Sequence, residues 1–225
     1  MIRKSWWKIL SVVLLLYTFT AGFLIPVPRL GNLYQSSRNM FFHVPMWFCM
    51  MILFTISVVH AVKHLRNPSV NSDIYSVAFA RMGTTYGVLG LITGAIWANY
   101  TWGEPWSNDP KQLLAAIALL IYAAYFILRN SIPDMDKRAK VGAVYNIFAF
   151  AMLFPTLWII PRMVESLHPG GKGVEGNPGI NGADLDATMR MVFYPAAIGW
   201  ALLGIWITTL VIRAEQLKEK QLANA

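Results

Sequence analysis

Charged residues are scarce in this sequence. Asp, Glu, Lys and Arg together make up 13% of the 225 residues, whereas 56% are hydrophobic. A soluble domain has about a quarter charged residues, because polar groups must cover its surface. The scarcity argues against an ordinary soluble domain and predicts an integral membrane protein.

Cysteine is almost absent, and nucleotide-binding motifs are missing. Cys49 is the single cysteine, which rules out an internal disulfide, and we expect it to serve packing. The lack of a Cys-x-x-Cys pair excludes thiol exchange and cysteine-linked attachment of a prosthetic group by this chain. No glycine-rich loop ends in Gly-Lys-Ser/Thr, so any energy source has to be a partner.

The hydrophobic residues that are present gather in six runs of roughly 16–22 residues, the length of a membrane-spanning helix. These runs are 9–25, 41–62, 77–97, 113–128, 141–160 and 191–212. The first run is too long for a signal peptide and has no small-x-small cleavage site before Pro26. We therefore predict an all-α polytopic membrane protein, a single domain of six transmembrane helices.

Basic residues predict the orientation of these helices. If both termini share a side with the loops 63–75 and 129–140, that side holds 12 of the 19 Lys and Arg residues. The termini are then cytoplasmic by the positive-inside rule. Arg81 lies near the cytoplasmic end of the third run, where its long side chain reaches the headgroups. The formal charge of +8 thus indicates topology and anionic lipid, and no basic-aromatic pattern points to nucleic acid.

Two outer loops, 98–112 and 161–190, are large enough to form a site. The first contains Tyr100, Trp102 and Trp106. Such crowded rings favour an apolar shelf for a flat ligand over an aromatic belt, which is spread over several helix ends. The second loop has six glycines, and we expect a flexible lid. Those glycines are Gly170, Gly171, Gly173, Gly176, Gly179 and Gly182.

Asp109 stands where the fourth run begins. Pro110 follows it, and Gln112 occupies the third helical position, the pattern of an N-cap with a capping box. An aspartate fixed in a cap has no evident proton to move, so we favour a structural role for Asp109 over a catalytic one.

The four histidines fall into two pairs. His60 and His64 lie four residues apart at the cytoplasmic end of the second run, a spacing that suits a metal but lacks further ligands, so we expect hydrogen-bonding roles. His43 and His168 are the outer histidines. Each alone is typical of a side chain at the membrane interface. Together they suggest two imidazoles that approach a planar iron porphyrin from opposite faces.

A family resemblance rests on these residues. The segment Trp102-Gly103-x-x-Trp106-x-x-Asp109 resembles the tryptophan-rich WWD signature of the haem-handling membrane proteins of cytochrome c biogenesis. The six-span layout and His43-Val44-Pro45 look most like the haem exporter C branch, the cytochrome c maturation C components. The resemblance implies b-type, non-covalent haem at the periplasmic face of a bacterial inner membrane. Its iron is ligated by His43 and His168, and it rests against Trp97, Trp102, Trp106 and Asp109.

The resemblance also implies partners. Haem passes to a periplasmic haem chaperone of the cytochrome c maturation E type, assisted by a small single-span subunit and ABC-transporter components, and this chain has no ATPase of its own. Arg38 and Lys111 are the candidates to pair with the haem propionates. Weaker candidates are Arg29, Arg162 and Arg190, and lipid headgroups are the alternative partner for all of these cations.

One position departs from the family pattern, and other functions stay open. Asn108 stands where the family has another Trp, and Asp109-Pro110-Lys111 is closer to the cytochrome c synthase branch, whose members usually have more spans. If Asn108 is only a tolerated departure, Asn108→Trp should preserve haem binding.

Two other functions are alternatives to haem transfer. One is a b-type cytochrome subunit with a permanently bound bis-histidine haem, and the other is a solute channel, which would need ionisable residues at mid-membrane.

Overall fold

The computed structural model describes residues 5–28, 33–173, 176 and 185–223. Nearly all of these residues are helical, and the part of the chain described contains no strand. The helices are α1 (Trp6–Leu24), a 3₁₀ turn η2 (Gln35–Asn39), α2 (Met40–Arg66), α3 (Val70–Trp102), α4 (Pro110–Asn130), α5 (Met135–Leu153), a π-helical turn η3 (Phe154–Ile159), α6 (Ile160–Met163) and α7 (Ala187–Ala223).

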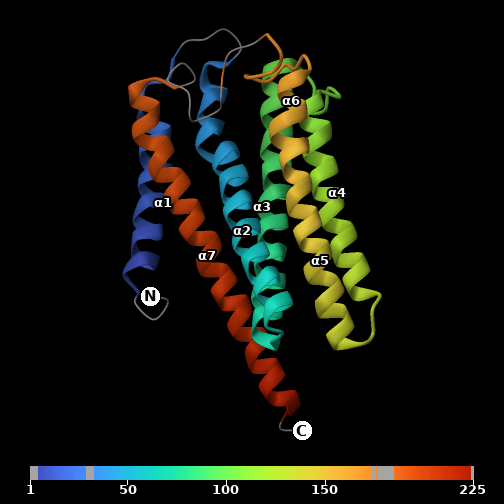
Figure 1. Cartoon of the computed structure of the whole chain (residues 1–225). Helices are drawn as coiled ribbons and strands as arrows, with labels where there is room; N and C mark the ends of the chain where they lie inside the picture. Colours follow the sequence, from blue (N-terminus) through green and yellow to red (C-terminus); the bar gives the residue numbers. More distant parts are fainter. Residues whose placement is uncertain (1–4, 29–32, 174–175, 177–184, 224–225) are drawn as a thin grey trace.

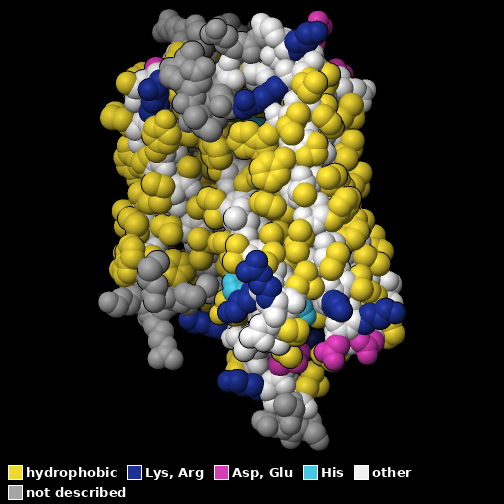
Figure 2. Space-filling view, viewed as in Figure 1, with side chains coloured by type: hydrophobic (Ala, Val, Ile, Leu, Met, Phe, Trp, Pro, Cys, Tyr) yellow, Lys and Arg dark blue, Asp and Glu magenta, His cyan; other side chains and the backbone are white. Residues whose placement is uncertain are grey.

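The long helices lie side by side in an up-and-down bundle (Figure 1). The first described residues of α1 and the last of α7 lie at the same end, and the last residues of α1, the α3–α4 connection and α6 lie at the other end. Hydrophobic side chains cover the middle of the visible face, and charged side chains gather toward its two ends (Figure 2). This is the surface of a polytopic membrane protein.

Five helical stretches are long and apolar enough to cross a membrane, among the residues described: α1, η2 with α2, α4, α5 through α6, and α7. α3 contains the predicted run 77–97 and is 33 residues long, but it falls outside this group. Arg81 and several threonines and glycines interrupt its apolar stretch, and two of the glycines lie in close contact with α2. A Cβ on Gly83 would come within 2.6 Å of Phe54, and one on Gly90 within 2.9 Å of Trp47. α3 has small residues where α2 lies against it, as is common between membrane helices.

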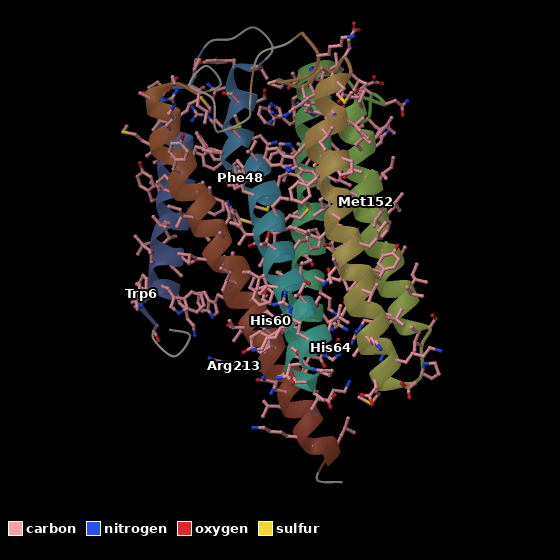
Figure 3. The ribbon with its side chains drawn as sticks, in the orientation of Figure 1. Trp6, Phe48, His60, His64, Met152 and Arg213 are labelled. Carbon is pink, nitrogen blue, oxygen red and sulfur yellow. The ribbon has the colours of Figure 1, made fainter. Side chains whose placement is uncertain are left out.

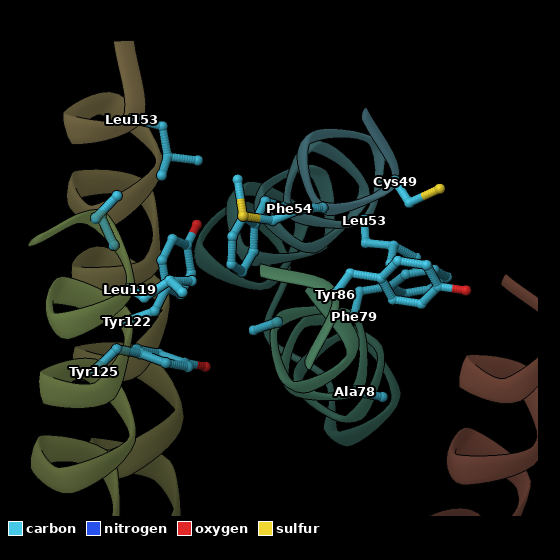
Figure 4. Close-up of a cluster of buried hydrophobic side chains, with 14 of the residues drawn as sticks. Cys49, Leu53, Phe54, Ala78, Phe79, Tyr86, Leu119, Tyr122, Tyr125 and Leu153 are labelled. Atoms are coloured by element: carbon cyan, nitrogen blue, oxygen red, sulfur yellow. The ribbon is translucent and has the colours of Figure 1, made fainter. Parts of the chain in front are cut away.

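α2 is the central helix, and it packs against α3, α5 and α7. Its side chains form much of a buried core with α3, α4 and α5 (Figure 4). The rings of Phe54 and Tyr122 stack in this core with centroids 3.6 Å apart. A polar contact adds to the packing, because the amide of Asn146 in α5 donates to Ser57 of α2 at 2.7 Å and to Ser76 of α3 at 3.0 Å. In a membrane such bonds fix how helices are aligned.

Both predicted outer loops are shorter in the structure. α3 continues through Trp102, so residues 98–102 are helical, and Gly103 ends the helix in the left-handed region at φ 86°. Pro161 to Met163 belong to α6, and α7 begins at Ala187. The rest of the glycine-rich loop is described only in part, because 174–175 and 177–184, with Gly179 and Gly182, lie outside the described residues. The site is therefore built more from helix ends than from loops.

Candidate functional site

A cavity of about 740 Å³ lies at the end of the bundle that holds the α3–α4 connection. Its size falls in the range of about 300–1,000 Å³ that is usual for ligand sites. The lining is mostly apolar and includes five tryptophans from four segments of the chain. They are Trp47, Trp97, Trp102, Trp106 and Trp158. Both His43 and His168 also line this cavity.

His43 lies in the first turns of α2 and is held by α3. Its Nδ1 is 3.0 Å from the carbonyl oxygen of Gly90 and 3.2 Å from the hydroxyl of Thr93. A carbonyl only accepts, so Nδ1 carries the proton, and Nε2 of the neutral ring keeps its lone pair. Gly94 makes room for the ring, because a Cβ there would come within 2.7 Å of the His43 Cε1. α3 therefore fixes both the position and the tautomer of this imidazole.

His168 is held in the same manner by Asp109. Its Nδ1 is 2.8 Å from the Asp109 Oδ1, and Trp102 lies edge-on to the ring with centroids 4.7 Å apart. The carboxylate accepts at Nδ1, so Nε2 is again the nitrogen that is left for a ligand. His168 comes from the segment after α6, and its side chain is 26% exposed, whereas His43 is part of a helix. The two histidines thus differ in how firmly the fold holds them.

The Asp109 carboxylate has more partners than the predicted cap. It accepts the backbone N–H of Lys111, which confirms the N-cap of α4. It also accepts the Ser166 hydroxyl and the Leu167 backbone N–H, at 2.9 and 2.7 Å. The capping box is not formed, because Gln112 accepts the backbone N–H of Ser107 and not that of Asp109. One carboxylate therefore joins the start of α4 to the segment that carries His168.

Burial of the Asp109 carboxyl raises its pKa, but the hydrogen bonds from His168, Leu167 and Ser166 outweigh burial, so the pKa of Asp109 lies far below its ordinary value. A depressed pKa stabilises the fold at every pH above the unfolded value of about 3.9, and this contribution is lost as the pH falls through the folded value. Near neutral pH Asp109 is a fixed anion, in accord with a structural role.

The tryptophan-rich loop between Gly103 and Asp109 has a defined conformation. The Trp106 indole N–H donates to the Asn108 side chain at 2.9 Å. Asn108 has φ 55°, the left-handed region, which Asn adopts far more readily than Trp does. Tyr100 does not join the predicted aromatic shelf, because it is 73% exposed on α3 and outside the cavity lining. An asparagine at position 108 therefore suits the left-handed backbone conformation there.

The predicted propionate-binding cations are only partly brought together. Lys111 lines the cavity and donates to the carbonyl of Pro169, and Arg162 also lines it, 5.6 Å from the Trp158 ring. Arg38 does not line the cavity, because its guanidinium donates to the Gly22 carbonyl and to the Gln35 side chain.

Of the two remaining candidate cations, the structure describes only Arg190. Arg190 donates to the carbonyl of Leu185, and it lies outside the cavity lining. Arg29 lies outside the described residues. Lys111 and Arg162 are therefore the cations that the fold places beside the two histidines.

Two of the five cavity tryptophans were not assigned to the site from the sequence. Trp47 follows His43 by four residues, so the two share one face of α2, and this helical spacing was a usable signal. Trp158 lies in η3, between Pro155 and Pro161. A π turn of this kind changes the direction of side chains in a way that sequence periodicity does not show.

The other two histidines lie far from the cavity. Figure 3 shows His60 and His64 in the half of the bundle that holds Arg213, whereas Phe48, which lines the cavity, is nearer the other end. His64 is buried, with Nδ1 3.1 Å from the Ser69 carbonyl and 3.2 Å from the Ser72 hydroxyl. Within the described residues, no cluster of three His, Cys, Asp or Glu side chains could hold a metal ion.

Comparison with known proteins identifies the family. The model of the family described as cytochrome c assembly protein matches residues 2–168. The chain belongs to this family. It is 25% identical over 185 residues to heme exporter protein C of Haemophilus influenzae, covering 82% of this chain and 73% of that protein. The corresponding protein of Bradyrhizobium diazoefficiens is 24% identical over 185 residues, with 81% and 68% covered.

A second group of relatives matches over stretches of different length. Cytochrome c biogenesis protein CcsA of Atropa belladonna is 27% identical over 177 residues, covering 75% of this chain and 56% of that protein. Cytochrome c biogenesis protein CcsA of Thermosynechococcus vestitus is 46% identical over 99 residues. That match covers 44% of this chain but only 30% of the CcsA protein. Heme exporter proteins and CcsA proteins therefore both share sequence with this chain, and the two heme exporter proteins share it over most of their length.

The conformation of Asn108 leads to a different expectation for Asn108→Trp than the family pattern alone. Trp in the left-handed region lowers the free energy of unfolding by about 1 kcal/mol, and the Trp106 indole loses its acceptor. Asn108→Gly is the matched control, because it loses the same hydrogen bond without strain. Thermal unfolding in detergent, followed by circular dichroism, should rank the Trp variant below the Gly variant. A Trp variant as stable as the unmodified protein would contradict the backbone conformation.

Proposed function

We propose that this chain crosses the membrane six times with both termini in the cytoplasm, binds haem non-covalently at its outer end and delivers it to a periplasmic haem chaperone during cytochrome c biogenesis. One observation carries the proposal. His43 and His168 are each held through Nδ1 by an acceptor on another segment, so both present Nε2 as the available nitrogen at one apolar cavity.

The residues of the cavity suit haem as cargo. Two neutral imidazoles saturate the axial positions of the iron and leave none for oxygen chemistry. The tryptophan rings offer flat apolar surface to the porphyrin, and Lys111 and Arg162 at the lining offer cations to the propionates. We withdraw Arg38 from this role, since its guanidinium is used to join α1 to the start of α2.

Delivery, rather than permanent binding, follows from the unequal positions of the two histidines. His43 is part of α2, whereas His168 lies in a partly exposed segment that is tied to α4 through Asp109. A b-type cytochrome subunit would hold its haem between histidines of packed helices. A ligand on a surface segment is suited to release. The partners in this proposal are the maturation E-type chaperone, a small single-span subunit and ABC-transporter components, in the bacterial inner membrane.

The matched lengths support the exporter branch over the synthase branch. The aligned region covers 73% of the Haemophilus influenzae heme exporter protein C, against 56% of the Atropa belladonna CcsA protein and 30% of the Thermosynechococcus vestitus CcsA protein. We therefore propose that this chain is a transfer component without its own ATPase.

The axial ligands are tested by substitution. His43→Ala and His168→Ala should each weaken haem retention by at least about tenfold, because one iron face loses its nitrogen donor, and the double variant should be worse. His60→Ala is the control, since it lies at the other end of the bundle. The measurement is haem titration followed by absorption spectroscopy. A wild-type spectrum in His43→Ala, with loss in His60→Ala, would refute the assignment.

The role of Asp109 needs a separate variant. Asp109→Asn should weaken haem binding by about 10–100-fold, because one amide oxygen does not replace a carboxylate that accepts from His168, Ser166 and Leu167. Asp134→Asn is the matched control, since Asp134 caps α5 without any histidine contact. Equal haem affinity in the two variants would show that Asp109 serves only as the cap of α4 and that its contact with His168 does not contribute to haem binding.

Transfer is separated from binding by the tryptophans. Trp106→Ala should keep the bis-histidine spectrum but slow haem transfer to the apo-chaperone by about two- to tenfold, because without the aromatic contact, worth about 0.5–1.5 kcal/mol, the haem presents the wrong edge to the chaperone. Trp6→Ala, exposed at the far end, is the control. Stopped-flow absorption with purified chaperone measures the rate. Unchanged transfer by Trp106→Ala would remove this loop from the delivery step.

A further inference from the structure

A second cavity, of about 330 Å³, lies toward the opposite end of the bundle, between α3 and α4. It is near the end where α3 begins and α4 finishes (Figure 1). Val77, Arg81, Thr84 and Thr85 line it from α3, and Phe126 and Arg129 line it from α4. None of these residues belongs to the site described above. Two guanidinium groups and the apolar side chains of Val77 and Phe126 therefore line the same cavity.

Each guanidinium is held in place by a carboxylate outside the cavity lining. Arg81 pairs with Glu215 of α7 at 3.2 Å, and Arg129 pairs with Asp73 of α3. A guanidinium has five N–H donors; in the described part of the chain Arg81 uses one of them, and Arg129 uses two, toward Asp73 and the Arg138 carbonyl. The two arginines thus have donors left for a ligand with several acceptor oxygens.

The two threonines of the cavity are not the donors for such a ligand. The Thr84 hydroxyl donates to the Ala80 carbonyl and the Thr85 hydroxyl donates to the Arg81 carbonyl, both at 3.0 Å within α3. Asn130, which also lines the cavity, has no charge. Arg81 and Arg129 are therefore the residues of this cavity that would bind an anion.

The surface beyond the cavity is apolar. Val88, Ile92 and Ile96 are exposed on α3, and their spacing places them on the same face as Arg81. This stripe runs from the cavity toward the middle of the membrane. A soluble anion would gain nothing from the stripe, whereas a phospholipid has both an anionic phosphate and acyl chains that run along such a surface.

We propose that this cavity binds the phosphate group of an anionic phospholipid, between Arg81 and Arg129, with an acyl chain along the exposed stripe of α3. Arginine forks match phosphate oxygens in a bidentate manner, and basic pockets between membrane helices are known to take lipid headgroups. With the termini in the cytoplasm, the lipid belongs to the cytoplasmic leaflet. The site does not depend on haem, so a failure of this proposal and a failure of the proposed transfer function can be told apart.

Native mass spectrometry of the full chain in detergent tests the site, with phosphatidylglycerol as the anionic lipid and phosphatidylcholine as the neutral one. The unmodified protein should retain phosphatidylglycerol in preference, and Arg81→Gln should lower its affinity about fivefold, the equivalent of about 1 kcal/mol for one cation. Arg81→Lys keeps the charge without the planar fork, so it should bind with intermediate affinity. Lys140→Gln removes an exposed charge at the same end, outside the cavity, and should change little.

Three outcomes would overturn the proposal. Equal losses in Arg81→Gln and Lys140→Gln would show diffuse surface charge and no site. Equal retention of the two lipids by the unmodified protein would show that the cavity does not select an anionic headgroup. Displacement of phosphatidylglycerol by excess inorganic phosphate would assign the same arginines to a soluble anion, whereas retention under that excess supports the lipid. Circular dichroism of each variant separates loss of binding from loss of fold.

Discussion

The arrangement of the site depends on the carboxylate of Asp109. A buried anion is costly unless hydrogen bonds satisfy it, and Asp109 is satisfied by donors from two distant parts of the chain. Those donors fix the start of α4 and the residues after α6 at the same time. If the carboxylate were removed, the backbone N–H of Leu167 and the imidazole of His168 would each lose an acceptor in a half-buried place. The cavity would then lose one of its two presented nitrogens.

The membrane imposes the second constraint, and α3 shows how. In lipid there is no hydrophobic gain from bringing helices together, so close contact between backbones and buried polar bonds must replace it. The glycines of α3 provide the close contact with α2, and Asn146 provides a polar bond across three helices. α3 also carries the Gly90 carbonyl and the Thr93 hydroxyl, which hold His43.

Several parts of this arrangement could be predicted from the sequence. Apolar runs locate the helices, and the order Asp-Pro marks the start of α4, because both signals are local. Topology predicts that His43 and His168 share one end. The partners that orient the two rings could not be predicted, since the Gly90 carbonyl has no side-chain signature and Asp109 reaches across 59 residues. The same holds for Arg38, whose contact with α1 depends on packing. Trp102 was predicted to lie in a loop because the apolar run ends at residue 97, whereas α3 continues through Trp102 and ends at Gly103.

α3 is one unbroken helix of 33 residues, about 50 Å from end to end. Its first half carries Arg81, its second half carries the Gly90 and Thr93 acceptors, and its last residue is Trp102, against His168. A rigid rod that turns about its axis turns along its whole length. Arg81 at one end of the bundle and the groups that contact His43 and His168 at the other end therefore belong to one continuous helix, and a rotation of α3 about its axis would move all of them together.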